Sequence, residues 1–131
     1  QVRDEMVMNI DFAPTLLDFA GVPTPEDMQG QSLKPLLVGE TGLDWREEIY
    51  YHYYEFPFMT HVNPHYGIRN SRYKLIRFYG EVEGWEFYDL QNDPTEQQNS
   101  YYNNEYRKEI SKMKGRLKLL QKKYKDFKPE E

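Results

Sequence analysis

The stretch "YKLIRFYGEVEGWEFYDL", residues 73–90, decides the fold because it predicts a β-hairpin. The side chains of residues 73–79 alternate in polarity as those of a half-buried strand do. Residues 85–90 are again rich in residues that favour strands. The four residues "GEVE", 80–83, are short enough to join the two strands as an antiparallel pair. We therefore predict a sheet that is built outward from this hairpin.

Further strands are expected upstream of the hairpin. The segment "EEIYYHYYEF", residues 47–56, has a strong preference for strand structure. The segment "YGIR", residues 66–69, can add a short strand, with "NS" at 70–71 as a tight turn. The sequence thus predicts an antiparallel sheet of three or four strands.

A long helix is expected after the sheet. Apolar side chains are spaced 4, 3, 4, 3, 4 along one stripe: Tyr106, Ile110, Met113, Leu117, Leu120 and Tyr124. Gly115 lies on the polar side of this helix, where it costs about 1 kcal/mol of helix propensity. We expect the stripe to lie across the sheet, which makes the fold class α+β: a small antiparallel sheet packed against a long C-terminal helix.

The first 45 residues do not obviously belong to that unit. The segment "NIDFAPTLLDFAG", residues 9–21, predicts a short helix, with Asp11 as its cap and Pro14 in its first turn. Ala13, Leu16, Leu17 and Ala20 form its apolar face. Residues 22–45 are rich in proline and glycine and predict a long connecting loop, with one helical turn at 32–37. We therefore predict two parts, 1–45 and 46–131, and an apolar patch at residues 7–20 that another domain would cover.

Composition excludes several classes of function. The 131 residues contain no cysteine, which excludes disulfides, thiolate metal sites and a cysteine nucleophile. No run approaches the roughly 18 apolar residues of a membrane span. The net charge is −5, although residues 103–131 hold 10 Lys and Arg against 5 Asp and Glu. Because these basic residues fall on one predicted helix, we interpret them as a solvated helix face and predict no nucleic-acid partner.

The candidate binding residues lie in "HVNPHYGIRN", residues 61–70. His61 and His65 are expected in a loop, and with Arg69 they would form a positive rim suited to sulfate, phosphate or carboxylate. A zinc site of His52, His61, His65 and Glu55 is an alternative, but the spacing matches no metal motif and we predict no metal ligand. A purely structural aromatic loop is the remaining alternative.

The chain offers no nucleophile of its own. None of its serines lies in a G-x-S-x-G elbow, and no glycine-rich loop for phosphate is present. The segment "DLQNDPTEQQN", residues 89–99, lacks the pattern of a calcium loop and predicts a turn. In that turn Glu96 and Asn99 are expected to bond nearby backbone N–H groups. We therefore assign no catalytic residue.

Two blocks resemble the type I sulfatases. "MNIDFAPTLLDFAGVPTPEDMQGQSLKPLL", residues 8–37, resembles the segment that closes their α/β catalytic domain. "GIRNSRYKLIRFY", residues 67–79, and "WEFYDLQNDPTEQQN", residues 85–99, resemble their C-terminal subdomain. The segment "EFPFMTHVNPHYGIR", residues 55–69, is most similar to the branch that acts on sulfated glycosaminoglycans, including heparan and iduronate sulfatases.

The resemblance implies a function for the parent protein, a sulfuric ester hydrolase. Family members hydrolyse sulfate esters or sulfamates with a formylglycine nucleophile, made in a C/S-x-P-x-R motif, and a calcium ion. No such motif occurs here, so both groups would come from the upstream catalytic domain, and the fragment alone is expected to be inactive. Residues 46–131 would be the C-terminal subdomain and residues 1–45 the end of the catalytic domain.

The resemblance also implies a partner, a substrate and a location. The partner would be the upstream catalytic domain, and the substrate a sulfated saccharide. The loop 55–69 would wall the substrate pocket, with His61, His65 and Arg69 in binding rather than catalysis. The family is usually periplasmic or secreted in bacteria and lysosomal in animals. A free-standing carbohydrate-binding module, or a structural module without catalysis, is the alternative.

Overall fold

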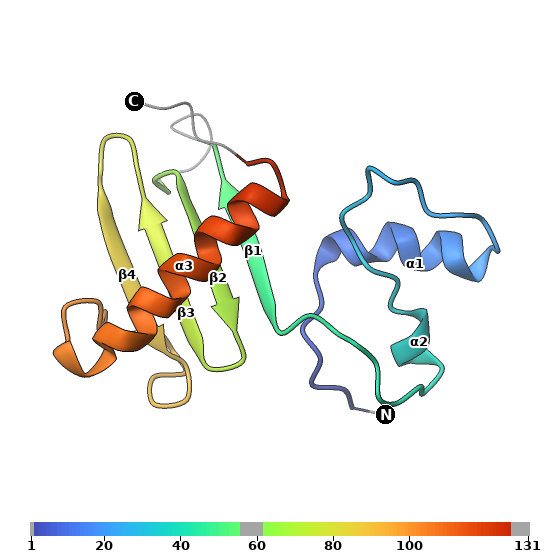
Figure 1. Ribbon diagram of the computed structural model, residues 1–131, viewed down its shortest axis with the longest axis horizontal. Coiled ribbons are helices and arrows are strands. Elements are labelled where there is room, and N and C mark those ends of the chain that lie inside the picture. The colour runs from blue at the N-terminus through green and yellow to red at the C-terminus, as the bar shows by residue number, and fades with distance from the viewer. Residues whose placement is uncertain (1, 56–61, 127–131) are drawn as a thin grey trace. The chain divides into compact units, whose positions relative to one another are not determined.

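The computed structural model describes residues 2–55 and 62–126 (Figure 1). It divides into two compact units, residues 1–47 and residues 48–131, which we call the N-terminal unit and the sheet unit. In the described ranges, no helix has the length and apolar character needed to cross a membrane.

The sheet unit contains an antiparallel sheet of four strands in the order β1-β2-β3-β4 (Figure 1). The strands are β1 (Glu48–Tyr53), β2 (His65–Asn70), β3 (Tyr73–Phe78) and β4 (Gly84–Asp89). Every strand pairs with its neighbour in the chain, because short turns join β2 to β3 and β3 to β4. The predicted hairpin is confirmed as β3 and β4, and the predicted sheet has four strands.

The register separates the side chains of the sheet into two faces. Leu75 is opposite Ile68 on one side and Phe87 on the other, so these three side chains share one face. All three are almost fully buried. His65, Gly67 and Arg69 alternate with them along β2 and therefore belong to the opposite face. We call the first the helix face and the second the open face.

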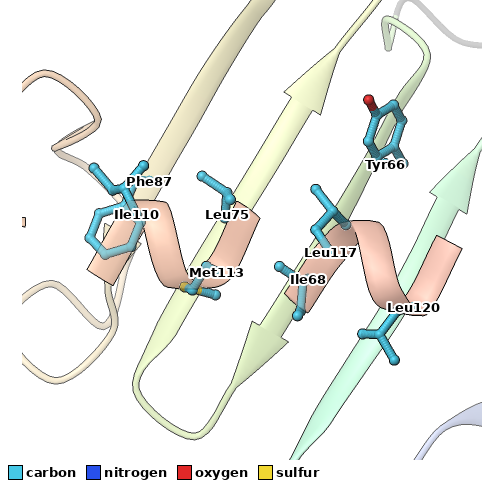
Figure 2. Close-up of a cluster of buried hydrophobic side chains, with 8 residues drawn as sticks. All are labelled: Tyr66, Ile68, Leu75, Phe87, Ile110, Met113, Leu117 and Leu120. Carbon is cyan, nitrogen blue, oxygen red and sulfur yellow. The ribbon is translucent and has the colours of Figure 1, made fainter. Parts of the chain in front are cut away.

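The helix α3 (Arg107–Lys123) covers the helix face, after a 3₁₀ turn η2 (Asn104–Tyr106) (Figure 1). Its side chains Ile110, Met113, Leu117 and Leu120 are buried in one cluster with side chains of β2, β3 and β4 (Figure 2). Tyr106 and Tyr124, at the ends of the predicted stripe, are partly buried and pack against this cluster. The predicted helix across the sheet, and the α+β class, are confirmed.

The N-terminal unit contains η1 (Asn9–Asp11), α1 (Phe12–Phe19) and α2 (Lys34–Leu37). Asp11 is the N-cap residue of α1, as predicted, but its side chain makes no capping hydrogen bond to this helix. The carboxylate of Asp11 is instead fully buried and accepts two hydrogen bonds from the Arg46 guanidinium, at 2.8 and 2.7 Å. It also accepts the backbone N–H groups of Met8 and Gln31, so it joins three segments of this unit.

The apolar face predicted for α1 is not the face that this unit buries. Pro14 and Thr15 are buried, whereas Leu16 is 70% exposed. Phe12 and Phe19 are exposed as well, and they lie on the same side of α1 as Leu16. The N-terminal unit therefore presents large apolar side chains at its surface, as the sequence predicted for residues 7–20.

Candidate functional site

The structure places two of the three predicted binding residues on one strand. His65 is the first residue of β2 and Arg69 is the fifth, and both belong to the open face. His61 lies outside the described residues. The prediction that His65 lies in a loop is wrong, because His65 pairs with Tyr53 of β1 and Phe78 of β3. Arg69, inside the strand predicted at 66–69, pairs with Ile49 and Lys74.

Aromatic rings hold the imidazole of His65. It stacks on Tyr53 with 5.5 Å between ring centroids, and it also contacts Tyr51 and Phe78 at 5.8 and 5.1 Å. Its Nδ1 atom lies 2.8 Å from the carbonyl oxygen of Asn63. Because a carbonyl can only accept, Nδ1 carries the proton and donates. Nε2 of His65 has no hydrogen-bond partner among the described residues, so it is available to a ligand.

Arg69 presents a positive charge from the same face. Its side chain is exposed, and within residues 2–55 and 62–126 it has no ion-pair partner. Lys74, directly across the strand pair, is bound instead to Glu96, with Nζ 2.6 Å from the carboxylate. Glu96 was expected to bond backbone N–H groups, and this ion pair corrects that expectation. Because Lys74 is already paired, Arg69 is the one of these two register partners whose charge a ligand can neutralise.

The centre of the open face is closely packed. A Cβ atom on Gly67 would lie 2.7 Å from the hydroxyl of Tyr51, so the Tyr51 side chain crosses the strand at this glycine. Burial raises the pKa of the Tyr51 hydroxyl, and the carboxylates of Glu96 and Glu86 raise it further. Burial also raises the pKa of Tyr88, helped by its hydrogen bond to Glu86, to about 12. Both tyrosines therefore keep their protons at neutral pH, and the Tyr88 hydroxyl donates to the carboxylate of Glu86.

The third histidine lies on the other side of the sheet. The imidazole of His52, 6% exposed, has Nδ1 at 2.6 Å from Asp126 and Nε2 at 2.7 Å from the Tyr79 hydroxyl. Asp126 also accepts the Tyr50 hydroxyl at 2.5 Å. Burial alone would raise the pKa of Asp126, but the hydrogen bonds from Tyr50 and His52 outweigh it and hold that pKa below its usual value. This network was not predicted from the sequence.

The described residues do not bring histidines and carboxylates together as a metal site would require. His52 and Tyr66 are register partners on the helix face, whereas His65 belongs to the open face. Within residues 2–55 and 62–126 no three His, Asp or Glu side chains form a group that could hold a metal ion.

The open face therefore presents two side chains, Arg69 and His65, whose chemistry suits hydrogen bonds to an anion. Arg69 can donate charge-assisted hydrogen bonds, and the Nε2 atom of His65 can accept a hydrogen bond or, when protonated, donate one. The partly buried rings of Tyr53 and Phe78 offer flat apolar surface beside these polar atoms. Such a mixture suits an anionic sugar.

Comparison with known families identifies the chain. A family model described as "N-sulphoglucosamine sulphohydrolase, C-terminal" matches residues 1–123. The chain belongs to this family. The relatives of this sulfatase C-terminal region include a solved structure described as a 2-O GAG sulfatase, as the resemblance predicted.

Three relatives show how much of such proteins this sulfatase region represents. The N-acetylglucosamine-6-O-sulfatase of Bacteroides thetaiotaomicron is 51% identical over 126 residues, which cover 95% of this chain and 23% of the relative. The Delta 4,5-hexuronate-2-O-sulfatase of the same bacterium is 32% identical over 109 residues, which cover 82% of this chain and 22% of the relative.

The third relative is a solved structure. It is described as being in complex with its substrate D-glucosamine-2-N,6-O-disulfate, and it superposes with a TM-score of 0.87 and 50% identity. The match covers 93% of this chain and 25% of that chain. This sulfatase region therefore spans about a quarter of the length of these relatives.

Proposed function

We propose that this chain is the C-terminal part of an enzyme that hydrolyses sulfate esters or sulfamates of sulfated sugars, and that its open face walls the substrate pocket. The chain would complete the fold of the enzyme and bind the substrate. It would contribute no nucleophile and no metal ligand.

One observation carries this proposal: His65 and Arg69 present, from the same face of β2, polar atoms that have no partner within residues 2–55 and 62–126. The ring of His65 is already oriented by Asn63 and by Tyr53, so little freedom would be lost when a ligand binds. A guanidinium on the same face matches the geometry of a sulfate or carboxylate. Binding, rather than proton transfer, is the role that we assign to both side chains.

The chemistry of the relatives supports the substrate class. One relative is a sulfatase of N-acetylglucosamine 6-O-sulfate groups by its name, and the solved structure holds a glucosamine with two sulfate groups. We therefore infer a sulfated amino sugar, or an oligosaccharide that contains one, as the substrate of the enzyme that includes this chain.

The described residues do not fit the calcium ion and the formylglycine of the family. They include no donor set for a metal ion, and the sequence has no cysteine and no serine in an S-x-P-x-R motif that could become formylglycine. We assign both groups to the upstream catalytic domain, and no step at that centre is assigned to the residues of this chain.

The upstream catalytic domain is the partner that we propose for the N-terminal unit. Phe12, Leu16 and Phe19 are 62%, 70% and 53% exposed, and together they form an apolar strip along α1. An exposed strip of this kind marks a surface that another part of a protein covers. Nothing polar on this strip points to a saccharide.

The experiment is sulfate release from D-glucosamine-2-N,6-O-disulfate by the full-length protein that contains this chain. His65→Phe keeps the aromatic packing but removes both nitrogen atoms, and Arg69→Met removes the charge. Lys118→Ala removes an exposed charge from α3 and serves as the control. One charge-assisted hydrogen bond corresponds to a loss of about tenfold or more in kcat/KM.

We expect that loss for Arg69→Met and His65→Phe, and no change for Lys118→Ala. The 131-residue chain alone should release no sulfate. Unchanged kinetics in both substituted proteins would overturn the role of the open face. Sulfate release by the chain alone would overturn the assignment of the chemistry to another domain.

We also propose a location, on the family resemblance alone: periplasmic or secreted in a bacterium, and lysosomal in an animal. Cell fractionation followed by detection of the protein tests this directly. Recovery of the protein in the cytosolic fraction would contradict it.

A further inference from the structure

A cavity of about 410 Å³ lies at the start of α3, on the helix side of the sheet. Its lining includes the side chains of Tyr101, Tyr102, Asn104, Arg107, Ser111 and Lys114. In Figure 1 these residues belong to the loop between β4 and α3 and to the first turns of α3, at the β4 edge. His65 and Arg69 belong to the opposite face of the sheet, so the cavity is separate from the open face.

One wall of the cavity is held rigidly. The ring of Tyr101 stacks on Trp85 of β4, with 5.9 Å between centroids and 6° between planes. Lys114 fixes the pair, because its Nζ atom lies 2.5 Å from the Tyr101 hydroxyl and 4.2 Å from the centroid of the Trp85 ring. Cation–π contact of this kind adds to the packing. The wall is therefore formed before any ligand arrives.

The backbone around the cavity is fixed as well. The N–H of Ser100 donates to the carbonyl of Phe87 in β4 at 2.8 Å, and the side chain of Asn99 accepts the N–H groups of Phe87 and Tyr101. The side chain of Asn103 caps η2 by accepting the N–H of Glu105 at 3.0 Å. A surface loop with this many bonds loses little entropy when it binds a ligand.

The mouth of the cavity offers an aromatic surface and a cation. Tyr102 is 84% exposed and stands at 87° to Tyr101, so its ring is open to solvent. Arg107 is exposed, and the described part of the chain provides no carboxylate within ion-pair distance of it. Two carboxylates lie two residues away in sequence, those of Glu105 and Glu109, and neither lines the cavity; that of Glu105 is bonded to Asn103. Ser111 and Asn104 add exposed hydrogen-bonding groups.

We propose that this cavity is a second, non-catalytic binding site for a sulfated saccharide. Arg107 and Lys114 would bind sulfate groups through charge-assisted hydrogen bonds, and Tyr102 would pack against the C–H face of a sugar ring. The choice of a sulfated ligand rests on the proposed function. The site would hold a distant part of the same polymer whose end occupies the substrate pocket, and so raise the local substrate concentration.

The test is direct binding of a heparin-derived octasaccharide to the full-length protein, measured by calorimetry. Tyr102→Ala and Arg107→Ala remove the two exposed contacts, and Ser111→Glu introduces a negative charge into the cavity. Lys112→Ala removes the same charge as Arg107→Ala from another exposed position of α3 that does not line the cavity. All four positions are exposed, and thermal unfolding checks that each protein is folded.

We expect each of the three cavity substitutions to raise the Kd about fivefold to tenfold, since each removes or opposes a single contact of the charged or aromatic type. Lys112→Ala should change the Kd less than twofold. Chemically desulfated octasaccharide should bind at least tenfold more weakly than the sulfated form.

Three results would overturn the proposal. An equal loss in Lys112→Ala and Arg107→Ala would show a general attraction of polyanions to α3. Equal binding of the desulfated sugar would remove the role of sulfate. Tighter binding of a short duplex DNA, weakened by the same substitutions, would assign the cavity to nucleic acid. Because binding is measured without turnover, a protein that lacks sulfatase activity would contradict the proposed function and still test the cavity.

Discussion

The Nδ1 atom of His52 in β1 lies 2.6 Å from the carboxylate of Asp126, three residues beyond the end of α3. The same carboxylate oxygen accepts the Tyr50 hydroxyl. The segment after α3 is therefore bonded to β1, 74 residues earlier in the chain. This contact fastens the C-terminal end of the helix to the edge of the sheet.

Replacing Asp126 should weaken the fold in a way that depends on pH. Asp126→Asn leaves two donors poorly paired, the Tyr50 hydroxyl and Nδ1 of His52. We expect a loss of about 1–3 kcal/mol in the free energy of unfolding at pH 7. The pKa of Asp126 is held below its ordinary value of 3.8, so its contribution is complete above that value and is lost as the pH falls below it.

The measurement is urea unfolding of both proteins between pH 7 and pH 3. The difference in the free energy of unfolding between the two proteins should be constant near pH 7 and should shrink below about pH 4. A difference that grew with acidification would contradict the sign of this linkage.

The buried ion pair of the N-terminal unit should be costly to break from one side. Arg46→Met leaves the fully buried carboxylate of Asp11 without its cation, and we expect a loss of about 3 kcal/mol. The double substitution Asp11→Asn with Arg46→Met should cost less than the sum of the two single ones. Thermal unfolding of the four proteins measures the coupling, and strict additivity would show that the pair contributes nothing as a pair.

Two leucines of α3 provide a matched test of the core. Leu117 is 2% exposed and Leu119 is 58% exposed, although they are two residues apart on the same helix. Leu117→Ala should cost about 2–5 kcal/mol, because it opens a cavity against β2 and β3. Leu119→Ala should change stability by less than about 0.5 kcal/mol. Equal effects in chemical unfolding would mean that α3 does not pack as described.

Two glycines should respond in opposite directions to alanine. At Gly67 a Cβ atom would lie 2.7 Å from the carbonyl oxygen of Leu75 and 2.7 Å from the Tyr51 hydroxyl, so the open face must distort. At Gly115 it would meet nothing within 4 Å. Gly67→Ala should lower the melting temperature, whereas Gly115→Ala should stabilise the helix by about 0.5–1 kcal/mol. Thermal unfolding of both proteins checks the contrast.

The parts of the fold that depend on local pattern were predictable. The alternation in 73–79 predicted β3, and the spacing from Ile110 to Leu120 predicted which side chains of α3 are buried. These signals come from residues that lie close together in the chain, so a single sequence contains them.

The parts that depend on distant partners were not predictable in the same way. Asp11 was expected at the N-cap of α1 and lies there, but its carboxylate bonds Arg46, which is 35 residues away. His65 was expected in a loop, but pairing with Tyr53 and Phe78 extends the strand to include it. Strand register would have had to be known first, and register also reveals that Tyr51 and Lys74 share the face of Arg69. The binding role of His61, His65 and Arg69 stays a prediction.

The order of the strands also affects the kinetics of folding. Because each strand pairs with its neighbour in the chain, the hairpins of the sheet form from contacts that are close in sequence. The contacts of Arg116 with Glu48 and of Asp126 with His52 instead close loops of 68 and 74 residues. Such long loops close last, since their entropy cost is recovered only when the helix docks. Loosening the Asp126 contact should therefore speed unfolding and leave the folding rate nearly unchanged.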